Sequence, residues 1–370
     1  MMKQRDNLHK VKRIVLKVGS SLLADPEHGI NTGMVQRLAN NIKRLQDSGI
    51  QVCLVSSGAV ALGRVQLGWL DKHLSIHEKQ AAAAIGQPLL MHAYQQAFSE
   101  LDLVVAQMLL TKDDLRHRRR YINASNTSKT LFAAGVVPIV NENDTVVVEE
   151  IKFGDNDTLG ALVSMVVEAD LMVMMTDVDG LFESNPHQDK DAKRLSDVAQ
   201  LTANIMDMAG DAGSGFGTGG MKSKLDAAKM ATQSGVTAAI INGQRQDELF
   251  KLLEGEDVGT VFFRNHDRQS WHEHWIRNLL PVSGQLSLNV DTIDDRHVWI
   301  EQIESLRGDF DKGECVELWH GQTLLGRGLT NYAAEDMRKL LGMRTADIER
   351  VLGYVDFKSM IHRDNLVIEQ

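Results

Sequence analysis

The sequence predicts an α/β fold, a three-layer sandwich with a mostly parallel sheet, followed by a small β-rich C-terminal domain. Short β-branched runs alternate with longer helical patterns through the first two thirds of the 370 residues. Such alternation is typical of a parallel sheet covered by helices on both faces. At about Val261–Pro281 the pattern becomes polar, aromatic and aperiodic. Short alternating segments between Gly and Asp turns follow, which favour a small β domain.

The individual elements follow from hydrophobic periodicity and from turn residues. In the first part, the expected strands are Ile14–Val18, Gln51–Val55, Leu103–Leu109, Val136–Val140, Leu171–Thr176 and Ala238–Ile241. The expected helices are Met34–Gln46, Glu78–Phe98, Asn123–Ala133, Thr158–Val167 and Lys224–Gln233, several of them ended by glycine. In the second part we expect strands at Gln285–Val290, His297–Ile300, Cys315–Trp319 and Thr323–Gly328, and a helix at Ala333–Leu341. The predicted boundaries are 1–262 for the first domain, 263–281 for a linker and 282–370 for the β-rich domain.

Composition excludes several classes of protein. A hydrophobic content of 43% and a charged content of 24% are those of a globular chain. The sequence contains no apolar run of about 18 residues, so we expect no membrane span. Its N-terminal segment is polar, so we expect no signal peptide. Cys53 and Cys315 cannot build a disulfide framework or a thiolate metal site, so we expect a reducing, cytoplasmic setting. A net charge of -10 disfavours nucleic acid and anionic membranes as partners.

The first candidate site residues stand at the end of the first predicted strand. Lys17 lies within an apolar strand, where a lysine is costly to bury unless it reaches solvent or meets an anion. Gly19 and Ser20 follow it and offer backbone amides. We favour a phosphate site here over an edge-strand lysine.

The second strand ends similarly, at Ser57 and Gly58 before the next helix. Backbone donors at a helix start suit a phosphate or a carboxylate. Taken alone, however, capping of the helix by Ser57 is the commoner outcome.

The densest polar cluster flanks a valine-rich hairpin. Its members are Asn141, Asp144, Asp155, Asn156 and Asp157. Asp157 could be a helix N-cap, but the whole cluster exceeds what capping needs and would bind an ammonium group or steer cations. A calcium cage is not expected because the necessary spacing is missing.

The most unusual segment is the glycine-rich stretch 213–224, which leads into a helix. Its backbone amides can wrap phosphates, and Lys222 or Lys224 can add charge. It matches neither the dinucleotide-binding fingerprint in context nor the Walker A motif, because Met221 separates Gly220 from Lys222. A flexible surface linker is the alternative, and the helix directly after it argues against that.

Three other sequence features are weaker indications of a functional site. The loop from Thr176 to Pro186 follows a strand and is, on spacing alone, a turn-rich surface loop. The basic run Arg116–Arg120 favours a solvated or intersubunit face over a ligand site. His272 and His274 lack further ligands at zinc spacing.

Together these motifs resemble the amino acid kinase family over nearly the whole chain. The segments that carry the resemblance stand in the family's order: VLKVGSS at 15–21, VSSGA at 55–59, VNEND at 140–144, GDND at 154–157, Thr176–Asp177 and GTGGMKSK at 217–224. The tail from about Val282 resembles a PUA domain. The resemblance implies the amino acid kinase fold, with ATP and Mg²⁺ used to phosphorylate the γ-carboxylate of L-glutamate, the first step of proline biosynthesis.

The resemblance also implies residue roles. Lys17 and Lys224 would neutralise charge on the transferring phosphoryl group, and Asp157 would hold both lysines. Ser57, Asp144 and Asn156 match the family's glutamate positions, with Asn141 and Asp155 near the α-amino group and Gly58 beside the attacked carboxylate. The implied ATP-binding residues are Lys17, Gly19, Ser20, Thr176, Asp177, Thr218, Gly219, Gly220, Met221, Lys222, Ser223 and Lys224. Magnesium would arrive as the ATP complex, with no dedicated protein metal site.

The same resemblance implies proline as a feedback inhibitor, a homo-oligomer (dimer or tetramer), and hand-over of the product to glutamyl phosphate reductase. Sister kinases acting on another acidic amino acid, N-acetylglutamate, carbamate or UMP are the alternatives, and an acidic ammonium pocket favours free glutamate. RNA binding by the tail is not expected, because residues 282–370 hold ten basic against sixteen acidic residues, a net charge of -6.

Overall fold

The computed structural model describes residues 4–25, 29–116, 118–146, 155–184, 189, 191–207, 220–264, 276, 280–293 and 297–369; for residues 4, 116, 118, 119 and 155 it describes the backbone alone. The chain divides into two compact units, Met1–Asp267 and Arg268–Gln370. The finer boundaries 1–262, 263–281 and 282–370 stay a prediction.

An eight-stranded sheet forms the centre of the first unit, in the order β5-β6-β4-β1-β7-β9-β10-β8. Neighbouring strands from β5 to β9 are parallel, and β10 runs antiparallel to β9. Strand β1 is flanked by β4 on one side and β7 on the other. The strands are β1 (Arg13–Val18), β4 (Gln51–Val55), β5 (Val105–Leu110), β6 (Val137–Glu142), β7 (Leu171–Thr176), β8 (Asp197–Val198), β9 (Thr237–Asn242) and β10 (Thr260–Phe262), with a separate pair β2 (Ala24–Asp25) and β3 (Gly29–Ile30).

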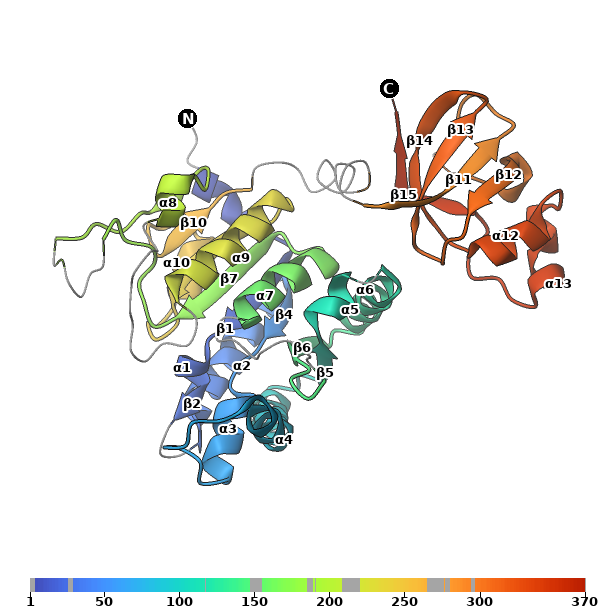
Figure 1. Cartoon of the computed structure of the whole chain (residues 1–370). Coiled ribbons are helices and arrows are strands. Elements are labelled where there is room, and N and C mark those ends of the chain that lie inside the picture. Colours follow the sequence, from blue (N-terminus) through green and yellow to red (C-terminus); the bar gives the residue numbers. More distant parts are fainter. Residues whose placement is uncertain are drawn as a thin grey trace. The chain divides into compact units, whose positions relative to one another are not determined.

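Helices cover both faces of this sheet, which confirms the predicted three-layer arrangement (Figure 1). Alternate residues of β1 face opposite layers: Leu16 joins the core cluster under α2 and α4, whereas Val15 joins the cluster under α7 and α9. The helices of the first unit are η1 (Gln4–Lys10), α1 (Ser20–Leu23), α2 (Thr32–Asp47), α3 (Ala59–Gln66), α4 (Ile76–Ser99), α5 (Lys112–Arg116), α6 (Arg118–Ala133), α7 (Asp155–Val166), α8 (Ala203–Asp207), α9 (Met221–Gln233) and α10 (Glu248–Leu253). The predicted helix and strand positions of this unit are confirmed, with ends that differ by a few residues.

Two helices, α3 and α4, cross at very short range because each places a glycine at the crossing. A Cβ atom added to Gly63 would lie 1.8 Å from the carbonyl oxygen of Ala82, and one added to Gly86 would lie 1.8 Å from that of Ala59. No other residue type fits at these positions without moving the helices apart. The close crossing fixes α4 against the segment that follows β4.

The second unit contains a five-stranded sheet in the order β12-β11-β13-β14-β15. Its elements are β11 (Val282–Leu288), η4 (Ile300–Gln302), β12 (Ile303–Gly308), β13 (Cys315–His320), β14 (Thr323–Thr330), α12 (Ala334–Leu340), η5 (Thr345–Asp347), α13 (Ile348–Leu352) and β15 (Ile361–Ile368). Among its described residues, this unit contains a large hydrophobic cluster, in which Leu286, Val316 and Met337 are fully buried, and a smaller one formed by Ile276, Cys315, Leu329 and Val367. The predicted β-rich character of the tail is confirmed.

One strand prediction in this unit is wrong. Residues His297–Ile300 form no strand; Val298 makes an isolated bridge to Ile361, and the chain then turns into η4. The turn is capped by Gln302, whose Oε1 accepts from the Trp299 N–H at 2.8 Å. Strands β12 and β15 were not predicted because β12 is largely exposed and β15 is interrupted by polar residues.

Among the described helices, none has the length and hydropathy that a bilayer span requires.

Candidate active site

Three charged side chains from three elements meet at the carboxyl end of β1. Lys17 comes from β1, Asp157 from the first turn of α7, and Lys224 from the first turn of α9. The Lys17 Nζ lies 2.5 Å from Asp157 Oδ1, and the Lys224 Nζ lies 3.5 Å from Asp157 Oδ2. All three are buried, with 4%, 0% and 5% of Lys17, Asp157 and Lys224 exposed. We call these three residues the Lys–Asp–Lys triad.

Burial and charge act against each other within the triad. Burial alone would raise the pKa of Asp157, but Lys17 and Lys224 outweigh it, so this pKa lies below its usual value. For Lys224, burial lowers the pKa; Asp157 partly offsets that, and Lys17 adds to it. With both lysines protonated and Asp157 ionised, two ammonium groups share one carboxylate and the triad carries one net positive charge. A buried site of this kind is complementary to an anion.

Ser223 fixes the orientation of the shared carboxylate. Its Oγ donates to Asp157 Oδ2 at 2.8 Å and also lies 2.8 Å from the carbonyl oxygen of Gly220. Gly220 is the N-cap of α9, and Met221 begins the helix. The glycine-rich loop thus enters α9 at the triad. Lys222 is exposed, and Thr218 and Gly219 lie outside the described residues.

The short turn after β1 lies between β1 and β7. Gly19 is the N-cap of α1, and its N–H donates to the Met175 carbonyl at 3.2 Å. Ser20 is the first residue of α1. The sequence predicts that the Gly19 amide faces a phosphate. In the structure this N–H is hydrogen-bonded to β7.

A second group of polar side chains lies on the β4 and β6 side of β1. The amide nitrogen of Asn156 is 3.0 Å from the Ser56 carbonyl, 2.9 Å from Ser57 Oγ and 3.2 Å from Asn141 Oδ1. Asn141 Nδ2 in turn donates to Gln87 Oε1 at 2.8 Å. We call Gln87, Asn141, Asn156 and Ser57 the amide network.

The amide network leaves one acceptor without a partner. The Asn156 Oδ1 atom is buried and receives no hydrogen bond from any residue that the structure describes. Its amide cannot be reversed, since that would place an oxygen against the Ser56 carbonyl. An unpaired buried acceptor is unfavourable until a donor arrives, so this oxygen marks a place for an N–H group.

The remaining predicted substrate residues lie around this network. Gly58, with φ of +102°, is the N-cap of α3, a left-handed conformation that favours glycine. Asp144 is half-buried in the turn after β6. Asp155 is the first residue of α7, and its side chain lies outside the described residues.

Thr176 and Asp177 stand at the carboxyl end of β7, on the other side of β1. Thr176 is 5% exposed, and its Oγ1 donates to Asp177 Oδ1 at 3.0 Å. Asp177 is exposed and contributes to the electrostatic environment of Lys224. These two residues therefore lie on the lysine side of the site, opposite the amide network.

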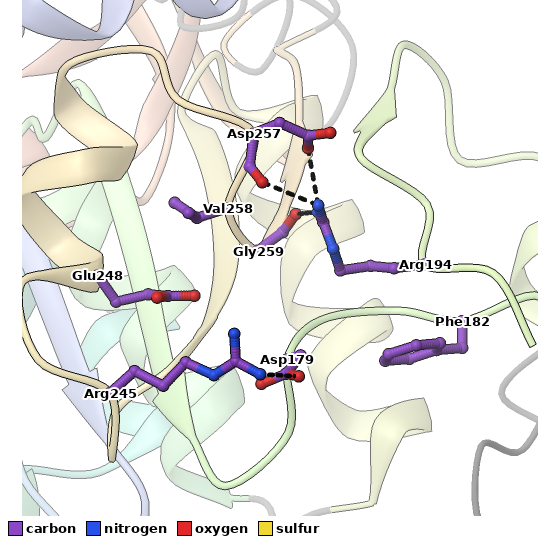
Figure 2. Close-up of a pocket in the computed structure, with 8 residues that line it drawn as sticks. All are labelled: Asp179, Phe182, Arg194, Arg245, Glu248, Asp257, Val258 and Gly259. Carbon is purple, nitrogen blue, oxygen red and sulfur yellow. Dashed lines mark hydrogen bonds and ion pairs between the residues drawn. The ribbon is translucent and has the colours of Figure 1, made fainter. Parts of the chain in front are cut away.

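A polar cavity of about 260 Å³ lies beyond the end of β7 (Figure 2). Arg194 pairs with Asp257 at 2.8 Å across one wall, and Arg245 pairs with Asp179 across another. None of the predicted site residues is among the residues that line it. Sequence reasoning did not find this cavity, because its charged side chains come from segments that are far apart in the sequence.

Two other sequence features are placed only in part. Of the run Arg116–Arg120, the described side chain of Arg120 pairs with Asp114 at 2.8 Å on the surface. His272 and His274 lie outside the described residues. Within the described part of the chain, no three His, Cys, Asp or Glu side chains gather as metal ligands would.

Sequence reasoning missed Gln87 and the Ser56–Tyr94 pair. Gln87 is a buried polar residue within an otherwise apolar helical run, and that contrast was the available signal. The hydroxyl groups of Ser56 and Tyr94 are 2.9 Å apart and connect the segment after β4 to α4. Burial raises the pKa of the Tyr94 hydroxyl, so it stays protonated.

Comparison with known sequences shows the family of the chain. The chain belongs to the amino acid kinase family, whose sequence model matches residues 12–242, and a PUA domain model matches residues 295–352. Its relatives include glutamate 5-kinases: that of Geobacter sulfurreducens is 45% identical over 98% of both chains. That of Geobacter sp. strain M21 is 42% identical, covering 99% of this chain and all of the relative. That of Desulfotalea psychrophila is 44% identical over the full length of both.

Proposed function

We propose that this chain catalyses the glutamate 5-kinase reaction, in which ATP phosphorylates the γ-carboxylate of L-glutamate to L-glutamyl 5-phosphate. This is the first step of proline biosynthesis. The observation that carries the proposal is the division of the site about β1. A buried cationic triad lies on one side, and an amide network with an unpaired acceptor lies on the other. Relatives more than 40% identical over nearly the whole chain bear the same activity in their names.

The triad supplies electrostatics for the transfer. As the γ-phosphoryl group passes from ATP to a carboxylate oxygen and ADP leaves, negative charge is spread over the phosphoryl oxygens. Lys17 and Lys224 stabilise that charge, and Asp157, held by Ser223, keeps the two ammonium groups at fixed positions. No covalent nucleophile is required, because the substrate carboxylate attacks directly. Magnesium enters as part of the MgATP substrate.

The amide network supplies recognition of the acceptor. We assign Asn156 Oδ1 to the α-ammonium group of glutamate, since a protonated amine carries the donors that this oxygen lacks. Ser57, Asn141, Asp144, Asp155 and Gly58 complete the proposed glutamate site. Thr176, Asp177 and residues 218–224 form the proposed nucleotide site, with Gly19 and Ser20 beside the phosphates.

Finer properties belong to the same proposal. Proline is the expected feedback inhibitor, the expected assembly is a dimer or tetramer in the cytoplasm, and glutamyl phosphate reductase is the expected recipient of the labile product. We assign catalysis to residues 1–262 and a stabilising or regulatory role to residues 282–370. The net charge of -6 in that tail argues against an RNA partner.

Hydroxylamine trapping of the acyl phosphate tests the function directly. We expect hydroxamate formation that requires ATP, Mg²⁺ and L-glutamate. Aspartate and N-acetylglutamate run in parallel are the specificity controls. Activity with one of those two compounds and none with L-glutamate would overturn the proposed substrate.

A further inference from the structure

Gln87 belongs to α4, which contributes no other residue to the amide network. It is 9% exposed, and its Oε1 accepts from Asn141 Nδ2 at 2.8 Å. Asn141, at the end of β6, is 2% exposed. The hydrogen bonds therefore run from Gln87 through Asn141 to Asn156, across three separate elements.

Both atoms of the Asn141 amide are used. Its Oδ1 accepts from the backbone N–H of Glu142 at 2.9 Å and from Asn156 Nδ2 at 3.2 Å. Its Nδ2 donates to Gln87. The amide cannot be reversed, since its NH₂ group would then face the Glu142 N–H. Gln87 is the acceptor that the Asn141 Nδ2 group meets in this orientation.

The orientation of Asn141 is transmitted to Asn156. Asn141 Oδ1 is one of three acceptors around the Asn156 amide nitrogen, and these contacts leave the Asn156 oxygen without a donor. If the Gln87 acceptor is removed, a buried N–H of Asn141 loses its partner, and Asn141 gains by turning away. Asn156 then loses a contact that holds its oxygen in place.

We propose that Gln87 is a positioning residue that sets the selectivity of the acceptor site for an α-amino group. This rests on the proposed function, in which Asn156 Oδ1 meets the α-ammonium group of glutamate. Gln87 acts through Asn141 and Asn156 and need not touch the substrate. Its effect is therefore confined to acceptors that carry the amino group.

The test compares L-glutamate with glutarate, which has the same two carboxylates and no amine. For the wild type and Gln87→Leu, one measures the KM for glutamate, the KM for ATP, and the inhibition constant of glutarate competing with glutamate. We expect Gln87→Leu to raise the glutamate KM about tenfold or more, the range for a weakened hydrogen bond to a charged group. The glutarate inhibition constant and the ATP KM stay within about twofold, since neither ligand uses the Asn156 oxygen.

Two further variants separate positioning from folding. Gln87→Glu retains an acceptor oxygen in either protonation state, so it keeps the wild-type preference for glutamate over glutarate. Gln95→Leu makes the same change on an exposed position of α4 and alters neither constant. If Gln87→Leu does not fold, Gln87→Met, which matches the glutamine in length, takes its place.

Gln87→Leu could lose thermal stability while its ratio of glutamate KM to glutarate inhibition constant stays at the wild-type value. That result would show that Gln87 only packs α4, and the inference would be wrong. An equal rise in both constants would overturn it as well. A wild-type protein that forms no hydroxamate from glutamate would instead overturn the proposed function.

Discussion

Replacing Asp157 by asparagine removes the shared carboxylate of the triad and leaves two buried ammonium groups facing each other. At an effective dielectric constant of about 20, the 2.5 Å and 3.5 Å contacts correspond to about 7 and about 5 kcal/mol of attraction. Desolvation of three buried charged groups offsets most of this. A loss of about 3–5 kcal/mol in the free energy of unfolding is therefore expected, as for other buried pairs that lose one partner.

The same substitution separates anion binding from turnover. The net charge of the triad rises from one to two positive units, so tripolyphosphate should raise the melting temperature of Asp157→Asn more than that of the wild type. The kcat should nevertheless fall by about 100-fold or more, because repulsion displaces both lysines from the positions the transfer requires.

The directions of the pKa shifts also predict how the difference in unfolding free energy between the wild type and Asp157→Asn varies with pH. The pKa of Asp157 is lowered by folding, so its contribution is present above the unfolded-state value and is lost as the pH falls through the folded-state value. The pKa of Lys224 is lowered too, so its unfavourable charge is relieved as the pH rises toward its unfolded-state value. The gap between wild type and variant, measured by urea unfolding, should be widest near neutral pH.

Equal unfolding free energies for the two proteins at pH 7 would refute this reasoning, as would a kcat for Asp157→Asn within about threefold of the wild type. Asp226→Asn, an exposed position on α9, provides the matched control.

Three other perturbations have clear expected outcomes. Lys17→Ala or Lys224→Ala should lower kcat by about 1,000-fold, whereas Asp144→Ala should mainly raise the glutamate KM; steady-state kinetics checks both, and near-normal kcat in the lysine variants would contradict the assignment. Gly63→Ala should destabilise the protein by about 1–3 kcal/mol or more, because its Cβ would lie 1.8 Å from the Ala82 carbonyl oxygen. Gly33→Ala, at a more open helical position, should not destabilise it. Equal melting temperatures for Gly63→Ala and the wild type would argue against the tight crossing. Cys53 is fully buried and burial raises its pKa to about 12, so Ellman's reagent should label it only after unfolding; rapid labelling of the native protein would contradict its burial.

The sequence predicts the catalytic unit well because its strands are buried on both faces. Gln51–Val55 and Leu171–Thr176 are observed with the predicted ends, since continuous apolar runs bounded by turn residues have few alternative arrangements. The C-terminal unit is harder to predict. Strand β12 is mostly exposed, so its sequence shows little alternation of apolar and polar residues. Residues His297–Ile300 lead into a turn that the Gln302 side chain caps.

For the site, the sequence places Lys17, Asp157 and Lys224 at strand ends and helix starts, and the structure brings them together. It cannot show that Gln87 joins Asn141, because 54 positions separate them and the contact depends on how α4 crosses α3. The catalytic and binding roles themselves stay predictions until the variants above are measured.

The neighbouring positions of Asn156 and Asp157 in the first turn of α7 have a thermodynamic consequence. Asn156 contacts Ser57 and Asp157 contacts Lys17, so in the proposed site both half-sites share a single helical turn. A ligand that shifts this turn from either side must change the affinity on the other. By linkage, glutamate alters the dissociation constant of the nucleotide by the same factor with which the nucleotide alters that of glutamate.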